Sequence, residues 1–107
     1  MEKQDQKIQE MQLLEQNLQS ILMQKQAFQM ELSETQAALK ELKKSGDEVF
    51  KIIGQLMIKT EKSKTEKELS EKEKLLELRT KTLEKQEASL TEKLDSLRDE
   101  FLKSMKK

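Results

Sequence analysis

The sequence predicts a mainly α chain: a long antiparallel two-helix coiled coil whose helices are joined by one central β-hairpin, through which several chains assemble. Three observations predict this class. Apolar residues recur in heptads on both sides of a short island rich in β-branched residues. Charged residues make up 39% of the chain and aromatic residues 3%, too little apolar surface for a compact core. We expect one domain over residues 1–107, with helices at 1–44 and 63–105 and a hairpin region at 45–62.

The first helix carries two apolar series that form the a and d positions of a coiled-coil seam. One series is Met11, Leu18, Leu32 and Leu39 with Lys25 in its gap, and the other is Leu14, Ile21, Phe28 and Leu42 with the polar Thr35. We expect Lys25 to extend its ammonium group to water and to help set the register. Met23 and Met30 fall outside the seam, where single apolar residues are ordinary. Gly46 is expected to end the helix in a left-handed conformation.

The island predicts two strands, Val49–Ile53 and Leu56–Thr60, joined by a two-residue turn with glycine first at Gly54-Gln55. Phe50 and Ile52 would face one way and Val49 and Ile53 the other, so both faces need cover. Burying its apolar side chains is worth roughly 10–20 kcal/mol, of which a lone hairpin would gain about half. The other half of this free energy favours association with other chains, and the open strand edges favour pairing edge to edge. The expected assembly residues are Val49, Phe50, Ile52, Ile53, Gly54, Leu56, Met57 and Ile58.

The second helix is expected to begin at a capping box, either Ser63 with Glu66 or Thr65 with Glu68. Its leucines repeat every seven residues at Leu69, Leu76, Leu83, Leu90 and Leu97. The companion seam position holds Glu66, Glu73, Thr80 and Glu87 before it turns apolar at Leu94 and Phe101. A fold around Gly54 aligns both seams, because it pairs Met11 with Leu97 and Leu32 with Leu76. We therefore expect the two helices to pair antiparallel within one chain.

The motif Val49-Phe50-Lys51-x-x-Gly54-x-x-x-x-Lys59 between two long helices resembles a beta-class prefoldin subunit. Further matches are Gln24-Lys25, Ala38-Leu39-Lys40-Glu41-Leu42 and Glu77-Leu78-Arg79. The resemblance implies a hexamer of two alpha-class and four beta-class subunits, with hairpins closed into an oligomeric β-barrel. It also implies an ATP-independent chaperone (a holdase) that captures unfolded polypeptides at the coiled-coil tips and transfers them to a group II chaperonin.

Antiparallel pairing places both chain termini at the arm tips. The apolar candidates there for client or chaperonin contact are Ile8, Met11, Leu14, Leu94, Leu97, Phe101, Leu102 and Met105. Seam packing is the favoured alternative for Met11, Leu14, Leu94 and Leu97. Simple packing of the helix ends is the alternative for the last three residues, and chaperonin docking is a second role for the same cluster.

Several function classes are not expected. The chain has no histidine and no cysteine, and its glycines do not form a phosphate loop, so we expect no enzyme activity, cofactor or metal. Zero net charge argues against a nucleic-acid partner. No apolar run approaches the roughly 18 residues of a membrane span, and no signal peptide is evident, so we expect a cytoplasmic protein. A structural coiled-coil scaffold or tether is the alternative function, although such a protein has no need of an apolar hairpin.

Overall fold

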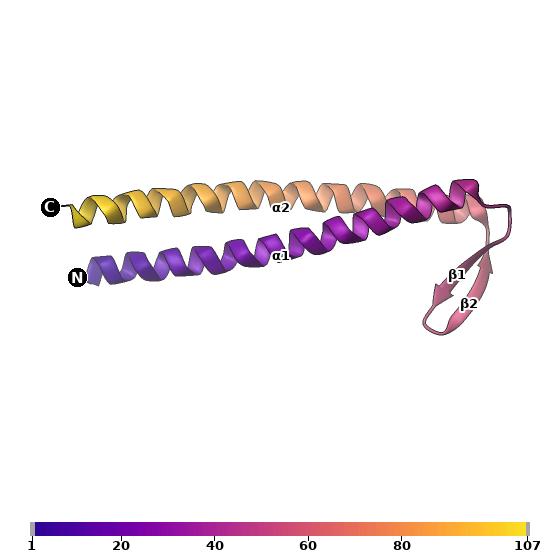
Figure 1. The fold of residues 1–107 in the computed structure, drawn as a ribbon, viewed down its shortest axis with the longest axis horizontal. Coiled ribbons are helices and arrows are strands. Elements are labelled where there is room, and N and C mark those ends of the chain that lie inside the picture. Colours follow the sequence, from indigo (N-terminus) through magenta and orange to yellow (C-terminus); the bar gives the residue numbers. More distant parts are fainter. Residues whose placement is uncertain (1, 107) are drawn as a thin grey trace. The chain divides into compact units, whose positions relative to one another are not determined.

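The computed structural model describes residues 2–106 and confirms the mainly α class (Figure 1). Helix α1 (Glu2–Lys44) is followed by strands β1 (Val49–Ile53) and β2 (Leu56–Thr60) and by helix α2 (Lys62–Met105). The chain divides into two compact units. The terminal unit comprises residues 2–27 and 80–106, and the hairpin unit comprises residues 28–79. Each unit contains its own stretch of α1 beside an antiparallel stretch of α2.

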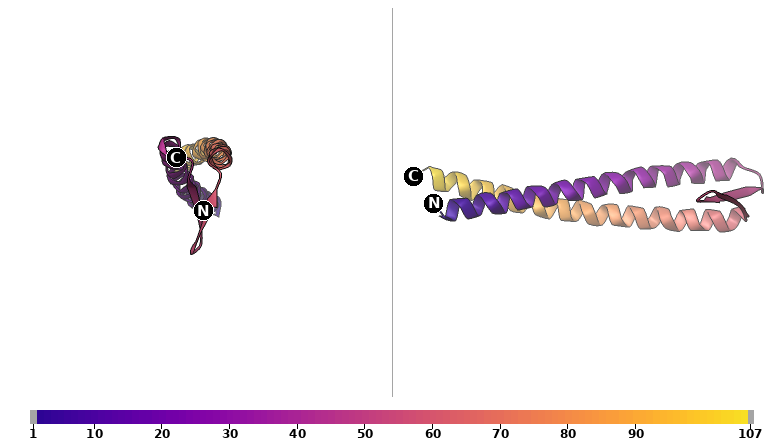
Figure 2. Two further views of the ribbon diagram at one scale, coloured as in Figure 1. Left: turned by 90° about the vertical axis from the view of Figure 1, so that its right-hand side faces the viewer. Right: turned by 90° about the horizontal axis from the view of Figure 1, so that it is seen from below.

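In the terminal unit, the beginning of α1 and the end of α2 lie side by side and run in opposite directions (Figures 1 and 2). The predicted seam supplies the least exposed side chains of this unit. Leu83 and Leu94 of α2 are buried. The partly buried seam residues are Met11, Leu14, Leu18, Ile21 and Lys25 of α1, and Glu87, Leu90, Leu97 and Phe101 of α2. The heptad spacing therefore identifies the contact face correctly, because residues three and four apart share one side of a helix.

Lys25 does not extend its charge into water as the sequence suggested. Its Nζ lies 3.1 Å from Oε2 of Glu87, and the two side chains are only 22% and 29% exposed. The seam position of Glu87 on α2 brings its carboxylate within reach, and the partly dry surroundings favour pairing over solvation. A polar pair at a seam position helps to specify register.

The hairpin unit contains the most completely packed part of the seam. Leu39, Leu42 and Leu76 are buried, together with Thr35. The Thr35 hydroxyl donates a 2.8 Å hydrogen bond to the Glu31 carbonyl one turn earlier, so this polar seam member is satisfied within its own helix.

Two interhelical ion pairs fit the predicted register, one in each unit. Residue 93 would face Glu15 in that register, and Glu15 pairs with Arg98 at 2.9 Å, five residues later. Residue 77 would face Glu31, which pairs with Lys72 at 3.0 Å, five residues earlier. Offsets of this kind are expected where residues flanking the seam pair across it. All four side chains are close to half exposed, so each pair contributes little to the free energy of unfolding.

The end of α1 differs from the prediction. Within residues 2–106 only Gly54 has a positive φ, so Gly46 does not adopt the left-handed conformation. Hydrogen bonds from Ser45 end the helix instead. Its backbone N–H and its hydroxyl both donate to the Leu42 carbonyl, at 3.2 and 2.8 Å. The Lys62 ammonium group donates to the Ser45 carbonyl at 2.9 Å. Side chains and a tightened last turn therefore satisfy the helix end without glycine.

The predicted capping boxes at the start of α2 are also wrong. Strand β2 continues through Thr60, so α2 begins at Lys62 and both Ser63 and Thr65 already lie in its first turn. The Thr65 backbone N–H donates to the Glu61 carbonyl at 3.0 Å, and its hydroxyl donates to the same carbonyl at 3.0 Å. The hydroxyl thus donates to a carbonyl, whereas the side chain of an N-cap accepts a hydrogen bond from a free backbone N–H of the first turn.

Substitution Leu76→Ala tests the seam directly. Leu76 is only 3% exposed, so its loss should lower the free energy of unfolding by roughly 2–5 kcal/mol. The neighbouring Leu75, which is 46% exposed, is the matched control, and Leu75→Ala should change stability by less than about 0.5 kcal/mol. Denaturant unfolding followed by circular dichroism at a fixed protomer concentration measures both. Equal effects of the two substitutions would contradict the assigned seam.

Substitution Lys25→Met tests the Lys25–Glu87 pair. It leaves a partly buried carboxylate without its cation and should cost about 1–2 kcal/mol. The double variant Lys25→Met/Glu87→Leu removes that unpaired charge and should recover most of the loss. The same unfolding measurement on these two variants and on the single variant Glu87→Leu gives the coupling free energy. Additive losses in the double variant would show that the pair has no energetic coupling.

Candidate functional site

The hairpin has the two strands and the turn that the sequence predicts. The strands pair antiparallel from Val49↔Thr60 to Ile53↔Leu56, which leaves two residues in the turn. Gly54 has a φ of 60°, and no described residue other than glycine has a positive φ. A positive φ at the first turn residue alone is the type II′ geometry, which matches the twist of hairpin strands. A side chain at residue 54 would strain this turn.

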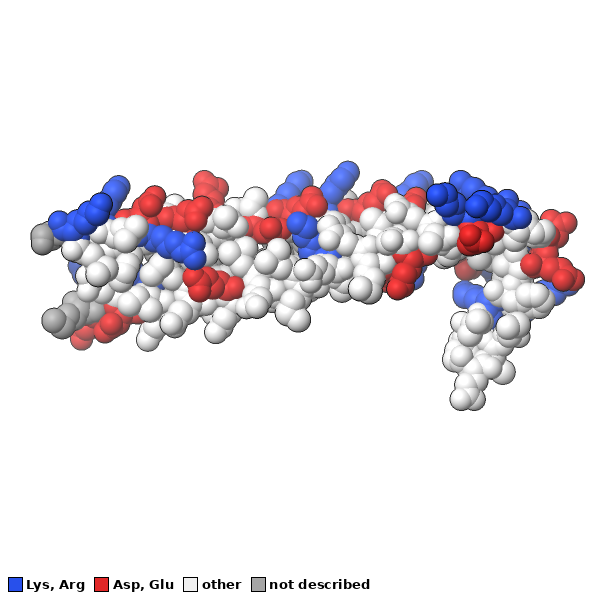
Figure 3. Space-filling view, viewed as in Figure 1, with Lys and Arg blue, Asp and Glu red and all other residues white. Residues whose placement is uncertain are grey.

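Most of the predicted assembly residues lie open to solvent. Val49, at the base of the hairpin, is the buried one and is 8% exposed. Ile52 is 70% exposed, and the exposed set is Phe50, Ile52, Ile53, Leu56, Met57 and Ile58. The hairpin stands off the helix pair, and its outer part carries no charged side chain (Figures 2 and 3). The chain thus buries less of this segment than the half expected from the sequence.

The strand register divides these side chains between two faces of the sheet. Phe50, Ile52 and Met57 share one face, and Ile53, Leu56 and Ile58 share the other. Within the described chain the sheet has only these two strands, so the outer edge of each strand lacks a strand partner. A two-stranded sheet is marginal by itself, and unpaired edges are templates for further strands. Covering six such side chains would contribute on the order of 10 kcal/mol.

An ion pair that the sequence did not reveal joins the hairpin to α2. Lys51 Nζ lies 3.3 Å from Glu68 Oε2. Both side chains are about half exposed, so the pair adds little stability. Val49 at the base of the hairpin is buried, whereas the apolar side chains of its outer part are exposed. No local pattern predicts this contact, because its two residues belong to different elements.

The predicted tip residues separate into two groups in the terminal unit. Leu94 is 4% exposed, and Met11, Leu14, Leu97 and Phe101 are partly buried in the seam. Ile8, Leu102 and Met105 are exposed. The second group lies near the two chain ends, which sit at the same end of this unit (Figure 2). Its contact with a client or a chaperonin stays a prediction.

The terminal unit also contains a shallow groove that the sequence analysis missed. It has a volume of about 600 Å³. The groove exists because Ser89 and Ser96, seven residues apart on α2, are too short to fill the space beside the seam leucines. The seven-residue spacing of these two small residues is the feature of the sequence that would have indicated the groove. The lining residues are Glu10, Leu13, Leu14, Ser89, Glu92, Lys93, Ser96 and Leu97.

The described part of the chain presents several surfaces for contact. Residues 2–106 contain no cluster of three or more histidine, cysteine, aspartate or glutamate side chains that is able to hold a metal ion. None of the helices in that range is both long and apolar enough to cross a membrane. The features that the structure presents are an apolar hairpin, exposed apolar residues at the helix ends and a groove.

Known proteins share this arrangement of two helices and a hairpin. Residues 5–107 match the family model described as "Prefoldin subunit". The prefoldin subunit beta of Methanothrix thermoacetophila is 37% identical over 98 residues, which cover 90% of this chain and 82% of the relative. The prefoldin subunit beta of Archaeoglobus fulgidus is 39% identical over 88 residues, which cover 80% of this chain and 76% of the relative.

The fold agrees with these matches. The crystal structure of the prefoldin beta subunit from Thermococcus strain KS-1 superimposes with a TM-score of 0.88 at 36% identity, covering 98% of this chain and 94% of that one. The family match spans nearly the whole sequence and includes the hairpin and both helices. This chain therefore belongs to the prefoldin family, as a chaperone subunit of the single-hairpin beta class.

Proposed function

We propose that this chain is one of four beta subunits that assemble with two alpha-class prefoldin subunits into a hexamer. The observation that carries this proposal is the hairpin, because its six exposed apolar side chains and its two open edges are unsatisfied within the described chain. Hairpins from neighbouring subunits would pair along these edges and close into a β-barrel, which removes free edges. The helices would then extend from this barrel as arms.

We further propose that the arms hold unfolded client proteins at their tips, without ATP, and transfer them to a group II chaperonin in the cytoplasm. Ile8, Leu102 and Met105 support this role, since they are exposed near the ends of both helices. Methionine is flexible and polarizable, which suits contact with clients of different sequence. Single tips would bind weakly, and several arms that act together would raise the avidity by orders of magnitude.

A structural scaffold is the alternative function. A scaffold needs the paired helices and their surface charges but gains nothing from a long apolar hairpin. An exposed apolar patch of this kind marks an interaction site. Prefoldins are chaperones rather than enzymes, and the proposed activity needs no cofactor and no nucleic acid.

Substitution Ile52→Asp tests the assembly role of the hairpin. A carboxylate buried in the barrel without a partner should weaken hexamer formation roughly tenfold or more. Leu78→Asp is the matched control, because Leu78 is equally apolar and 62% exposed on α2. Native mass spectrometry after co-expression with an alpha-class subunit reports the assembly state. A stable 2:4 complex of the Ile52→Asp variant, at wild-type yield, would refute the proposed barrel.

Suppression of aggregation tests the holding activity. The wild-type hexamer should keep guanidinium-unfolded citrate synthase from scattering light after dilution, with no nucleotide present. The double variant Leu102→Gln/Met105→Gln keeps good helix formers but removes apolar contact, so roughly several-fold more hexamer should be needed. Leu75→Gln/Leu78→Gln, two exposed leucines of the hairpin unit, is the control. An inactive wild-type hexamer would exclude the function, and full activity of the tip variant would exclude the tip residues.

A further inference from the structure

Methionines are the only readily oxidised side chains of this chain. The sequence contains six methionines and no cysteine, histidine, tyrosine or tryptophan. Oxidation of the thioether gives a sulfoxide, which converts a flexible apolar side chain into a polar one. A hydroperoxide therefore acts on this chain at those methionines that solvent reaches.

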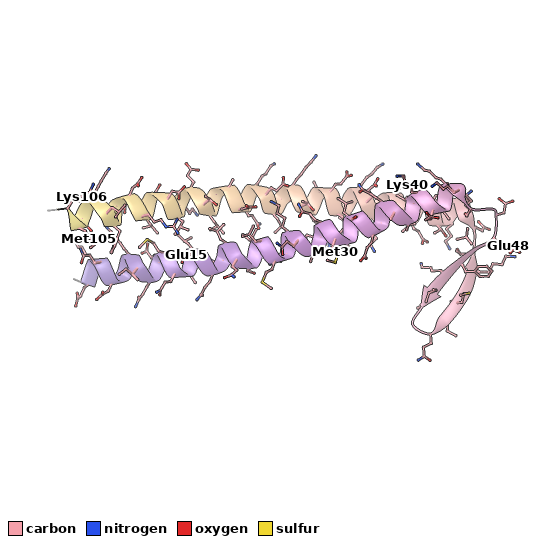
Figure 4. All side chains as sticks on the ribbon, viewed as in Figure 1. Glu15, Met30, Lys40, Glu48, Met105 and Lys106 are labelled. Atoms are coloured by element: carbon pink, nitrogen blue, oxygen red, sulfur yellow. The ribbon has the colours of Figure 1, made fainter. Side chains whose placement is uncertain are left out.

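Four of the methionines within residues 2–106 are exposed. Met23, Met30 and Met57 are each 67% exposed, and Met105 is 61% exposed. Met11 is partly buried in the seam. Met30 lies on α1 with its side chain directed away from α2 (Figure 4). Because the first three are equally exposed, we expect a small oxidant to reach them equally well in the isolated chain.

Met57 differs from the others in its position, because it lies in the hairpin. It stands directly opposite Ile52 in the strand register and shares a face of the sheet with it. Its neighbours along the strand, Leu56 and Ile58, are also apolar and exposed. Oxidation at Met57 thus places a polar S–O group in the middle of the apolar surface through which the subunits are proposed to join.

We propose that Met57 is a modification site at which oxidation to the sulfoxide blocks assembly of the free subunit, and at which reduction restores it. This inference rests on the proposed hexamer, because the barrel is what covers the sulfur atom. The sulfoxide oxygen is hydrated while the hairpin stands free. Closure of the barrel would remove that water, and burial of a polar group without a matching partner costs free energy.

The oxidation transfers one oxygen atom from hydrogen peroxide to Sδ of Met57. The S–O bond forms as the O–O bond breaks, so the sulfur loses two electrons and the peroxide is reduced to water. Methionine sulfoxide reductases reverse the step with a dithiol, which is oxidised to a disulfide while the sulfoxide oxygen leaves as water. The dithiol comes from outside the chain, which has no cysteine.

The effect of an oxidant should depend on whether the subunit is already assembled. In the proposed hexamer Met57 is covered, whereas Met23 and Met30 stay exposed on the helical arms. Oxidation should therefore stop free subunits from joining new hexamers and leave the existing hexamers intact. This direction distinguishes a site in the hairpin from general oxidative damage, which would affect free and assembled chains alike.

Partial oxidation of the wild-type chain tests the site without any substitution. The chain is treated briefly with hydrogen peroxide, freed of it and mixed with an untreated alpha-class subunit. Peptide mass spectrometry then compares the hexamer with the chain left unassembled. The sulfoxide of Met57 should be depleted from the hexamer roughly tenfold or more, whereas those of Met23 and Met30 should be shared evenly. An even share at all three positions would overturn the inference.

Substitution Met57→Leu supplies a second measurement, because leucine has a similar volume and is not oxidised. For each chain, native mass spectrometry gives the ratio of hexamer yield after peroxide treatment to the yield without treatment. This ratio should fall roughly tenfold or more for wild type and stay near one for Met57→Leu. Both methionine sulfoxide reductases with dithiothreitol should return the wild-type ratio to near one.

The untreated chain separates the two proposals. An untreated wild-type chain that forms no hexamer would refute the proposed assembly and this inference with it. An untreated chain that assembles, together with equal ratios for wild type and Met57→Leu, would refute the modification site alone.

Discussion

The architecture depends on a β-hairpin that the chain cannot satisfy by itself. The helices bury their apolar residues against each other, as the low exposure of Leu39, Leu76 and Leu94 shows. The hairpin has no such cover beyond Val49, and both of its edges are open within the described chain. Hydrophobic burial is the dominant favourable term in association, which is why the proposed hexamer is joined through this segment. In that proposal the helices take no part in the barrel and extend from it as arms.

The parts of the fold that the sequence predicts correctly are those fixed by local periodicity. The seven-residue repeat from Leu69 to Leu97 places those leucines in the seam, and α1 follows the same rule. Both strands have the predicted bounds because β-branched residues surround a glycine suited to the first position of a tight turn. The exposure of the hairpin also follows from the sequence. Apolar side chains lie on both faces of its strands, and they present more apolar surface than one chain is able to cover.

The remainder depends on contacts between elements, which local patterns do not encode. Ser45 ends α1 where glycine was expected, because its hydroxyl donates to the Leu42 carbonyl and the start of α2 brings the Lys62 ammonium group to the Ser45 carbonyl. Lys25 finds Glu87 across the seam rather than water. The groove beside Leu97 results from two serines on α2 that face leucines of α1, a juxtaposition visible only once the register is known.

Amide hydrogen exchange over residues 49–60 tests the central claim most directly. In the isolated chain at low concentration, the outward-facing amides of β1 and β2 should exchange quickly, because no strand pairs with the hairpin edges. In the complex with an alpha-class subunit, the same amides should exchange slower by orders of magnitude, as expected for strands inside a closed barrel. Fast exchange that persists in the assembled complex would contradict the account, because it would show that the subunits associate without pairing their hairpins.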